Sequence, residues 1–365
     1  MKCVFIYETM DIRYQPEQPR RPRPILIIGA GSIVKDAHLP AYAMAGYPVH
    51  AITNRSRAQA EALSEKWNID HVEASVESLI ANAPTGAVYD LTLPANLFAG
   101  VLRKLPEGAP VLIQKPMGES IDQAREILDV CRERRLVAAI NFQLRFAPFV
   151  MAAKYLIGRG TIGELRDMEI RVTTETPWDH FPFLKNVPRL EIVYHSVHHI
   201  DCIRHFLGTP RGIYAKTLRH PELDMPESRS SIIMDYGDEV RANIQTNHFH
   251  RYGPRHQESY IKWEGTHGCI KAKMGLLMNY PEGVPDAFEV CTFEGGKPEW
   301  RNHDLEGSWF PHAFVGCMAQ VMRAADGEPG ALVTSVEDSI QTMACVEAAY
   351  ASSASGGTSV DAFLR

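Results

Sequence analysis

The sequence predicts an α/β protein. A doubly wound parallel sheet fills the N-terminal half, and an α+β half with a large, open, mostly antiparallel sheet follows it. Three observations predict this fold. The chain has 365 residues, which exceeds the size at which one hydrophobic core usually keeps growing. Strand-like and helix-like segments alternate from residue 25 to 142, as in consecutive βαβ units. After residue 147, strand-like runs bounded by Gly, Pro or Asp follow one another.

The first buried strand is expected at 25–28, where four apolar residues precede Gly29. Gly29 and Gly31 supply the G-x-G half of a dinucleotide-binding (Rossmann) fingerprint. One glycine permits a tight turn, and the other lets the backbone approach a pyrophosphate. Val34 replaces the third glycine, so an ordinary strand-turn-helix is the alternative for this stretch alone. The backbone N–H groups that would hold the phosphates open the next helix, at Ser32 and Ile33.

Alternation continues through the first half of the chain. Further strands are expected at 49–53, 87–92, 110–113 and 136–142, with helices near 36–45, 56–67, 75–82, 95–104 and 120–134. We assign 25–147 to a Rossmann domain. Residues 1–24 precede it as a tail, because the stretch QPEQPRRPRP holds four prolines and no apolar residue.

The second half is assigned to 148–335, an α+β domain for substrate binding and oligomerisation. After a helix near 148–157, strands are expected at 166–174, 212–218, 230–236, 240–249, 260–263 and 268–273. Such a sheet buries one face, and we expect the free face to form a homodimer or homotetramer. Helices are expected at 311–325 and 335–352, the latter capped by Ser335. Residues 336–365 would pack back on the protein as a C-terminal helix and tail.

Composition excludes several classes of function. A net charge of −6 without a long Lys/Arg run provides no electrostatic footprint for nucleic acid or a membrane surface. No apolar run reaches the roughly 18 residues that a transmembrane helix needs. The seven cysteines are scattered without a C-x-x-C pair, which favours reduced thiols in the cytoplasm. Small molecules are therefore the expected partners.

Two predicted strand ends carry residues suited to a nicotinamide dinucleotide. An acidic residue after the second strand would bind the ribose hydroxyls of NAD. This chain has Asn54 and Arg55 there, a pair compatible with either NAD or NADP. Lys115 follows the strand at 110–113 and should point into the crevice where parallel sheets bind ligands. Pro116 could adopt a cis bond that aims the ammonium.

Several motifs, in their order and spacing, resemble the glucose-fructose oxidoreductase, inositol dehydrogenase and MocA (GFO/IDH/MocA) family. They are Gly-Ala-Gly at 29–31, Thr-Leu-Pro at 92–94, Gln-Lys-Pro at 114–116, NFQLRF at 141–146 and HHID at 198–201. The resemblance covers essentially everything after Pro24. It implies hydride transfer between a sugar or polyol CH–OH and NAD or NADP. The block HSVHHID at 195–201 further resembles D-apiose dehydrogenases, which implies oxidation of an aldose to a lactone.

The resemblance also implies roles for single residues. Lys115 would bind the reacting hydroxyl, and His198 would be the acid/base. An imidazole with a pKa near 6.5 can take a hydroxyl proton near neutral pH, while an ammonium stabilises the developing alkoxide. Gln114 replaces the family's Glu close to the nicotinamide. The remaining cofactor contacts fall on Thr92 and Pro94.

Tyr194 stands where the family has an Asp before the catalytic His. On a helix, Tyr194, His198 and Asp201 would share one face. Either Tyr194 donates a phenolic hydrogen bond to substrate, or His195 takes over part of the missing role. The other substrate candidates are Asp201 and three residues for which structural packing is the alternative, Asn141, Arg145 and Trp178.

Three alternatives complete the analysis. His195 and His198 have a spacing that could hold zinc, but no cysteine pair supports such a site, so no metal is expected. A family member that retains NAD can act as a glycosidase or oxidoisomerase, with Tyr194 as a second acid or base. A non-catalytic, cofactor-sensing binder would keep the fold without turnover.

Overall fold

The computed structural model describes residues 12–180, 182–280 and 282–363. Its first half is a six-stranded parallel sheet in the order β3-β2-β1-β4-β5-β6, as a doubly wound fold requires. The strands are β1 (Ile25–Ile28), β2 (Val49–Thr53), β3 (His71–Glu73), β4 (Val88–Leu91), β5 (Pro110–Ile113) and β6 (Val137–Ile140). The predicted Rossmann-type sheet is thus confirmed. Only the three-residue edge strand β3 escaped prediction, because it is too short for a periodic signal.

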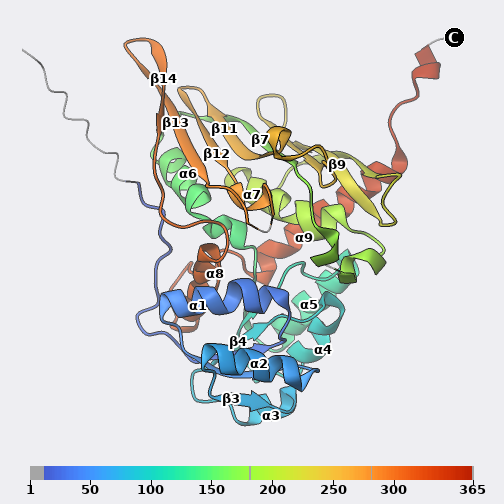
Figure 1. Cartoon of the computed structure of the whole chain (residues 1–365). Helices are drawn as coiled ribbons and strands as arrows, with labels where there is room; N and C mark the ends of the chain where they lie inside the picture. The colour runs from blue at the N-terminus through green and yellow to red at the C-terminus, as the bar shows by residue number, and fades with distance from the viewer. Residues whose placement is uncertain (1–11, 181, 281, 364–365) are drawn as a thin grey trace, which may run out of the picture.

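Helices cover both faces of this sheet (Figure 1). They are α1 (Leu39–Ala45), α2 (Arg57–Trp67), α3 (Val76–Ala81), α4 (Phe98–Leu102) and α5 (Ile121–Glu133). The helix predicted near 36–45 is divided, because a π-helical turn, η1 (Val34–His38), precedes α1. Ser75 and Ser120 cap α3 and α5 by accepting backbone N–H bonds. Ser56 occupies the N-cap position of α2 without making a capping bond.

The second half forms an eight-stranded sheet in the order β14-β13-β12-β11-β7-β10-β9-β8, antiparallel except for the β7–β10 pair. The strands are β7 (Leu165–Thr173), β8 (Gly212–Arg219), β9 (Glu227–Asp235), β10 (Arg241–Asn247), β11 (Glu258–Gly265), β12 (Gly268–Lys273), β13 (Ala287–Glu294) and β14 (Lys297–Asn302). The sequence analysis missed β13 and β14. Strand β14 is a mostly exposed edge strand with a proline, joined to β13 through Gly295 and Gly296, which both adopt positive φ.

Helices cover one face of this second sheet, the face toward the Rossmann domain (Figure 1). They are α6 (Pro148–Gly158), α7 (Val197–Leu207) and α9 (Val336–Ser355), which contact β12, β10 and β8 respectively. Helix α9 also contacts α5 of the Rossmann domain, so both halves share it, whereas α8 (His312–Ala325) packs on α1, β5 and β6 of the Rossmann domain. The predicted cap of α9 is confirmed, since the Ser335 hydroxyl accepts the Asp338 N–H. No helix among the described residues has the length and apolar character needed to span a membrane.

The segment before β1 lies along the surface from residue 12 onward. Arg23 donates to Asp326 at 2.6 Å, at the end of α8, and the Tyr47 hydroxyl donates to Gln18. The Glu306 N–H donates to the Tyr14 hydroxyl at 3.2 Å. These bonds bind the described part of the predicted tail to both halves of the protein.

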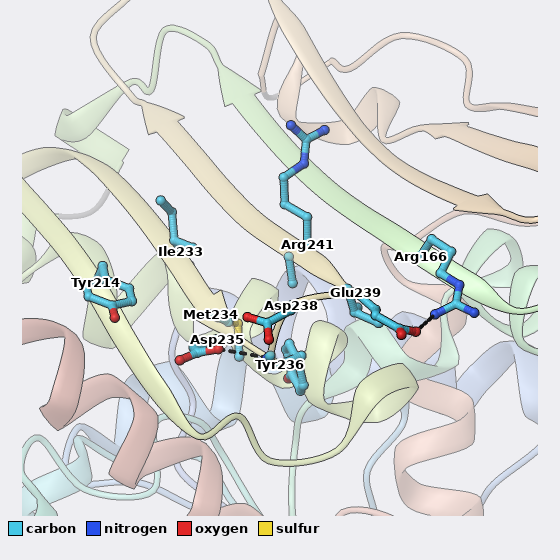
Figure 2. Close-up of a pocket in the computed structure, with 12 residues that line it drawn as sticks. Arg166, Tyr214, Ile233, Met234, Asp235, Tyr236, Asp238, Glu239 and Arg241 are labelled. Carbon is cyan, nitrogen blue, oxygen red and sulfur yellow. Dashed lines mark hydrogen bonds and ion pairs between the residues drawn. The ribbon is translucent and has the colours of Figure 1, made fainter.

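The other face of the second sheet is open. Tyr214 on β8 and Ile233 on β9 are cross-strand neighbours, and their side chains are 64% and 53% exposed. Beside them, the β9–β10 turn encloses a hollow of about 310 Å³ next to the Arg166–Glu239 ion pair (Figure 2). Its lining includes Tyr214 and Ile233 and none of the predicted site residues, so it is separate from the crevice at the Rossmann sheet.

Candidate active site

The carboxyl ends of β1 and β4 meet at Gly29 and Thr92. Gly29 has φ +121°, and a Cβ placed on it would lie 2.5 Å from Thr92 Oγ1 and 2.6 Å from Thr92 O, so only glycine fits. The Thr92 hydroxyl donates to the Ile28 carbonyl at 3.0 Å, which holds the two strand ends together. The tight turn predicted from the G-x-G motif is therefore built at Gly29.

The next residues leave room for a pyrophosphate. Apart from Gly31 and its chain neighbours, no atom of the described residues lies within 4 Å of the position that a Cβ on Gly31 would take. Gly31 and Ser32 are exposed, while Ile33 is half-buried. Open space at a glycine that precedes a helix is the feature that lets phosphates approach backbone N–H groups. Val34 is fully buried, so it packs in the core at the position of the third fingerprint glycine. These residues fit a dinucleotide.

The adenosine end would lie at the end of β2. Asn54 donates to the Ser56 carbonyl at 3.1 Å and to Gln59 at 3.0 Å, which orients its amide. Arg55 is exposed, and Pro94, at the start of the turn after β4, is exposed as well. No carboxylate follows β2 directly, because Asn54 takes the place of the acidic residue of an NAD-type fold.

Lys115 lies at the end of β5, where it was predicted, and the Lys115–Pro116 bond is cis. Its Nζ donates to the Tyr194 carbonyl at 2.8 Å, and its backbone N–H donates to Gln114 Oε1 at 2.7 Å. Burial lowers the pKa of the Lys115 amine to about 8. At neutral pH this amine is therefore a cation that can release its proton within the physiological range.

His195 and His198, from the second half of the chain, lie near Lys115. They lie in the π-helical turn η6 (Glu191–Ser196) and in the first turn of α7. Burial, followed by other positive groups that include Lys115, holds the pKa of both imidazoles well below the ordinary value. Both rings are therefore neutral at pH 7, and the described residues offer no hydrogen-bond partner to either buried Nδ1 atom.

Aromatic rings line this place. His198 makes edge contacts with Phe142, at a centroid distance of 6.5 Å, and with Trp309, at 5.5 Å. Trp178, in a short 3₁₀ turn (Trp178–His180), lies 5.7 Å from the ring of His195. Trp178 thus comes close to His195 as a pocket residue should, while Trp309 had no distinguishing signal in the sequence.

Tyr194 is oriented by a residue that the sequence analysis did not single out. Its hydroxyl donates to Glu119, in the loop after β5. Burial raises the pKa of the phenol, and the neighbouring Glu119 raises it further. Because Tyr194 lies in a π-helical turn, its spacing to His198 is not that of an α-helix, and its hydroxyl and its carbonyl serve Glu119 and Lys115 respectively.

His248 and Glu191 form a buried polar group behind His195. The rings of His195 and His248 are 4.5 Å apart, and His248 Nε2 lies 3.6 Å from Glu191 Oε1. The Ser196 hydroxyl donates to the same carboxylate at 2.6 Å. Burial acts to raise the pKa of Glu191, but His248 and the hydroxyl together hold it below its ordinary value. A strand was expected to run through residue 249, but β10 ends at Asn247 and His248 lies directly after it.

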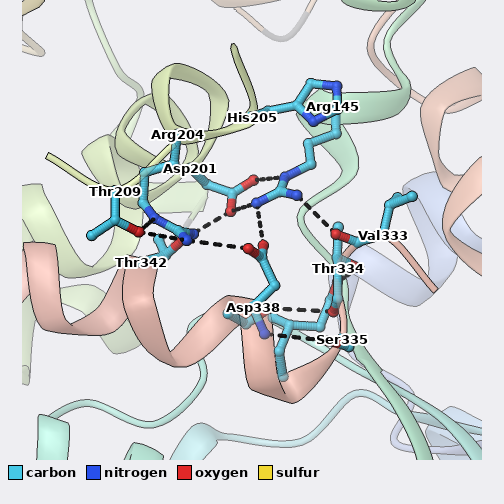
Figure 3. A network of polar contacts seen from close by, with 12 residues as sticks. Arg145, Asp201, Arg204, His205, Thr209, Val333, Thr334, Ser335, Asp338 and Thr342 are labelled. Atoms are coloured by element: carbon cyan, nitrogen blue, oxygen red, sulfur yellow. Dashed lines mark hydrogen bonds and ion pairs between the residues drawn. The ribbon is translucent and has the colours of Figure 1, made fainter. Parts of the chain in front are cut away.

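Arg145 and Asp201 lie together in a different cluster (Figure 3). Arg145 makes two bonds of 2.7 Å to the Asp201 carboxylate and one of 2.6 Å to Asp338 at the start of α9. Thr342 donates to Asp201 at 2.9 Å, and Arg204 reaches Asp338 at 3.1 Å. This cluster links the segment that follows β6 to α7 and α9, and it engages the polar atoms of Arg145 and Asp201, both predicted to contact the substrate.

Asn141, the remaining substrate candidate, is fully buried at the end of β6. Its Nδ2 lies 3.2 Å from His38 Nε2, and its Oδ1 has no partner among the described side chains and backbone groups. Within the part of the chain that the structure describes, no three His, Cys, Asp or Glu side chains are grouped to hold a metal ion.

Two stretches match known protein families. Residues 23–142 match the oxidoreductase family with an NAD-binding Rossmann fold, GFO/IDH/MocA. Residues 150–271 match the GFO/IDH/MocA C-terminal domain. Together these matches cover more than half of the chain, including the whole first sheet and the second sheet from β7 to most of β12.

Among curated proteins, D-apiose dehydrogenase of Rhizobium rhizogenes is 24% identical over 321 residues, covering 86% of this chain and 90% of that protein. D-xylose 1-dehydrogenase (NADP(+)) 2 of Haloferax volcanii is 25% identical over 225 residues, covering 60% and 68%. An oxidoreductase from Agrobacterium radiobacter, solved with NAD+, L-tartaric acid and magnesium, has a TM-score of 0.76 at 20% identity and covers 94% of this chain and 100% of its own. Levoglucosan dehydrogenase with NADH and levoglucosan also has a TM-score of 0.76, at 17% identity, covering 92% and 98%.

Proposed function

This chain belongs to the GFO/IDH/MocA family of oxidoreductases, and from that premise we propose that it is an NAD(P)-dependent dehydrogenase acting on a sugar or polyol CH–OH group. The observation that supports this most is the Lys115 amine at the end of β5, beside the neutral imidazoles of His195 and His198. A cationic donor next to a neutral proton acceptor is the pair that alcohol oxidation requires.

In this proposal, the nicotinamide supplies the hydride acceptor. The Lys115 ammonium binds the hydroxyl oxygen and stabilises the negative charge that develops on it. The His198 imidazole takes the hydroxyl proton, which it can do because burial keeps it unprotonated at neutral pH. Trp178, Trp309 and Phe142 exclude water from the same place.

We propose an uncharged aldose or polyol as substrate, oxidised at an anomeric or ring secondary hydroxyl. Support comes from relatives named for D-apiose and D-xylose and from the neutral imidazoles and aromatic rings around Lys115. D-Apiose, giving its lactone, is the first candidate. The guanidinium of Arg145, which could bind a sugar acid, is instead paired with Asp201 and Asp338.

The test is nicotinamide absorbance with NAD and NADP in separate wells, against aldoses, branched aldoses, inositols and methyl glycosides. Accumulation of reduced cofactor with one sugar supports the proposal and identifies the cofactor. Release of reducing sugar from a glycoside without net reduction would instead favour the NAD-retaining glycosidase. Cofactor binding without turnover of any sugar would favour the non-catalytic sensor.

The activity should depend on pH in a way that separates the roles of Lys115 and His198. With Lys115 as the charged donor, kcat/KM for oxidation should be level near neutrality and fall above pH about 8, where the ammonium is lost. If the neutral amine were the base, the rate would instead rise through pH 8. The Lys115→Arg variant retains its charge, so any residual activity should lack the alkaline decline.

Cofactor choice should respond to the end of β2. The Asn54→Asp variant places a carboxylate where it accepts from ribose hydroxyls and repels a 2′-phosphate, so the preference for NAD over NADP should rise about tenfold or more. Fluorescence titration with NADH and NADPH measures the ratio. Gln59→Ala is the matched control, because Gln59 holds the Asn54 amide without a charge. An unchanged ratio in Asn54→Asp would place the ribose elsewhere.

We propose that the open sheet face joins two or more copies of the chain. Its exposed apolar side chains lie near both ends, at Tyr214 and Ile233 and at Phe293 and Trp300. Exposed apolar groups on a wide sheet are typical of an interface between copies. Light scattering should give the mass of a dimer or tetramer, and a monodisperse monomer would contradict the proposal.

A further inference from the structure

Behind Lys115, a buried polar network connects three strand ends of the Rossmann domain. His38, Tyr42, Asp90 and Asn141 are completely buried, and Gln114 is 8% exposed. Asp90 Oδ2 lies 2.7 Å from His38 Nδ1 and accepts the Tyr42 hydroxyl at 2.7 Å. On the opposite side of the imidazole, Nε2 lies 3.3 Å from Gln114 Nε2 and 3.2 Å from Asn141 Nδ2.

The tautomer of His38 follows from these contacts. Gln114 Oε1 accepts the backbone N–H of Lys115 at 2.7 Å, and this bond distinguishes the oxygen of the side-chain amide from its nitrogen. The other end, Nε2, is a donor and faces His38 Nε2, so that ring nitrogen must carry a lone pair. The ring proton therefore resides on Nδ1 and is donated to the Asp90 carboxylate.

We propose that Asp90 and His38 are an orienting pair for the nicotinamide end of the site. By holding the imidazole in one tautomer, Asp90 makes His38 an acceptor for two amide groups. Gln114 is thereby locked with its oxygen on the backbone of Lys115, next to the nicotinamide end of the site, and Asn141 is held through its Nδ2 on the same ring nitrogen. Asp90 and His38 are both positioning residues, since they act through Gln114 and Asn141.

Burying the Asp90 carboxylate costs free energy, so its retention in the core favours a functional role for the pair. A carboxylate removed from water loses its hydration, and an apolar core of similar shape would be as stable or more so. Carboxylate–imidazole pairs of this kind orient the groups beyond them wherever a ring tautomer matters. His38 reaches Asp90 from the last residue of the π-helical turn η1, a rare element that is frequent at functional sites.

The test begins with Asp90→Asn. Its amide N–H can face His38 Nδ1, so the ring proton should move to Nε2, where it opposes the amide N–H of Gln114. We expect NADH affinity, measured by fluorescence titration, to fall about tenfold, and ¹⁵N histidine NMR to show the exchange of tautomer. Gln114→Glu in the same chain should restore most of the affinity. Its carboxylate accepts from Nε2–H and still accepts the Lys115 N–H.

Tyr42→Phe is the matched control. It removes the hydroxyl that donates to the same carboxylate and lies 3.2 Å from His38 Nδ1, but it leaves His38 paired with Asp90. It should bind NADH like the wild type. Two results would show that the network serves only packing and would overturn the proposal. One is an equal loss of NADH affinity in Asp90→Asn and Tyr42→Phe, and the other is the failure of Gln114→Glu to restore the affinity of Asp90→Asn. A wild-type His38 with its proton on Nε2 would also overturn it, even if Asp90→Asn failed to fold.

This inference takes from the proposed function only that the ligand is a nicotinamide dinucleotide. None of its readouts uses turnover. A wild-type protein that binds NADH but oxidises no sugar would contradict the proposed dehydrogenase function. The orienting pair would still be tested by the tautomer of His38 and by the rescue of NADH affinity in Gln114→Glu.

Discussion

Lys115→Met should abolish oxidation while making the protein more stable. We expect kcat to fall by about 10³-fold or more, because the donor that stabilises the alkoxide is lost. At pH 7, the free energy of unfolding should rise by about 1–2 kcal/mol. A pKa lowered from 10.5 to about 8 means that the folded state disfavours the ammonium by up to about 3 kcal/mol, and the lost bond to the Tyr194 carbonyl offsets about 1 kcal/mol.

The pH dependence of that stability gain has a definite sign. The pKa of Lys115 is lower in the folded than in the unfolded chain, so the unfolded chain binds more protons between pH 8 and 10.5. The penalty on the wild type is therefore complete below pH 8 and disappears as the pH rises to 10.5. Urea unfolding of both proteins at pH 7 and pH 10 should show the variant's advantage shrinking. A variant less stable at both pH values would contradict a buried, disfavoured ammonium.

Asp201→Asn should give the largest loss of stability among these variants, about 3–5 kcal/mol. The substitution keeps the shape of the side chain but leaves Arg145 buried without one of its two carboxylates. The amide must also turn an N–H toward the Arg145 or Thr342 donors. Urea unfolding with an unchanged m-value measures the loss.

Asp338→Asn is the matched control for Asp201→Asn. Asp338 contacts the same Arg145, but its side chain is 36% exposed. Water therefore replaces part of the lost interaction, and the loss of unfolding free energy should stay near 1 kcal/mol.

For folded Asp201→Asn protein, the KM for the sugar should stay within about threefold of the wild type. A stable Asp201→Asn variant with a tenfold higher KM would instead support the substrate contact that was predicted for Asp201 from the sequence.

Much of the site could be placed from local sequence. Residues that directly follow parallel strands share one edge of the sheet, so the strand pattern alone brought Gly29, Thr92 and Lys115 to one crevice. The need for glycine at position 29 could also be predicted from local sequence, since the turn after β1 has no room for a Cβ atom. His198 was found only through the motif resemblance, because nothing in the spacing of a buried histidine separates it from a core residue.

Where spacing was used across an irregular element, it was a poor guide. Tyr194 and His198 are four residues apart, which on an α-helix would align them, but the π-helical turn η6 ends between them. The sequence contains no clear sign of such a turn, because one extra residue per turn depends on how the segment packs. The hydroxyl of Tyr194 consequently reaches Glu119, a residue with no motif of its own.

The sequence by itself determined the alternation of strands and helices, the glycine turn and the lysine that follows β5. These follow from backbone sterics and from the burial of apolar residues at a regular period, which act over a few neighbouring residues. Only the tertiary structure decided the pairs Asp90–His38, His248–Glu191 and Arg145–Asp338. Their partners lie 52, 57 and 193 residues apart, and buried polar groups choose partners by geometry once the whole chain has packed.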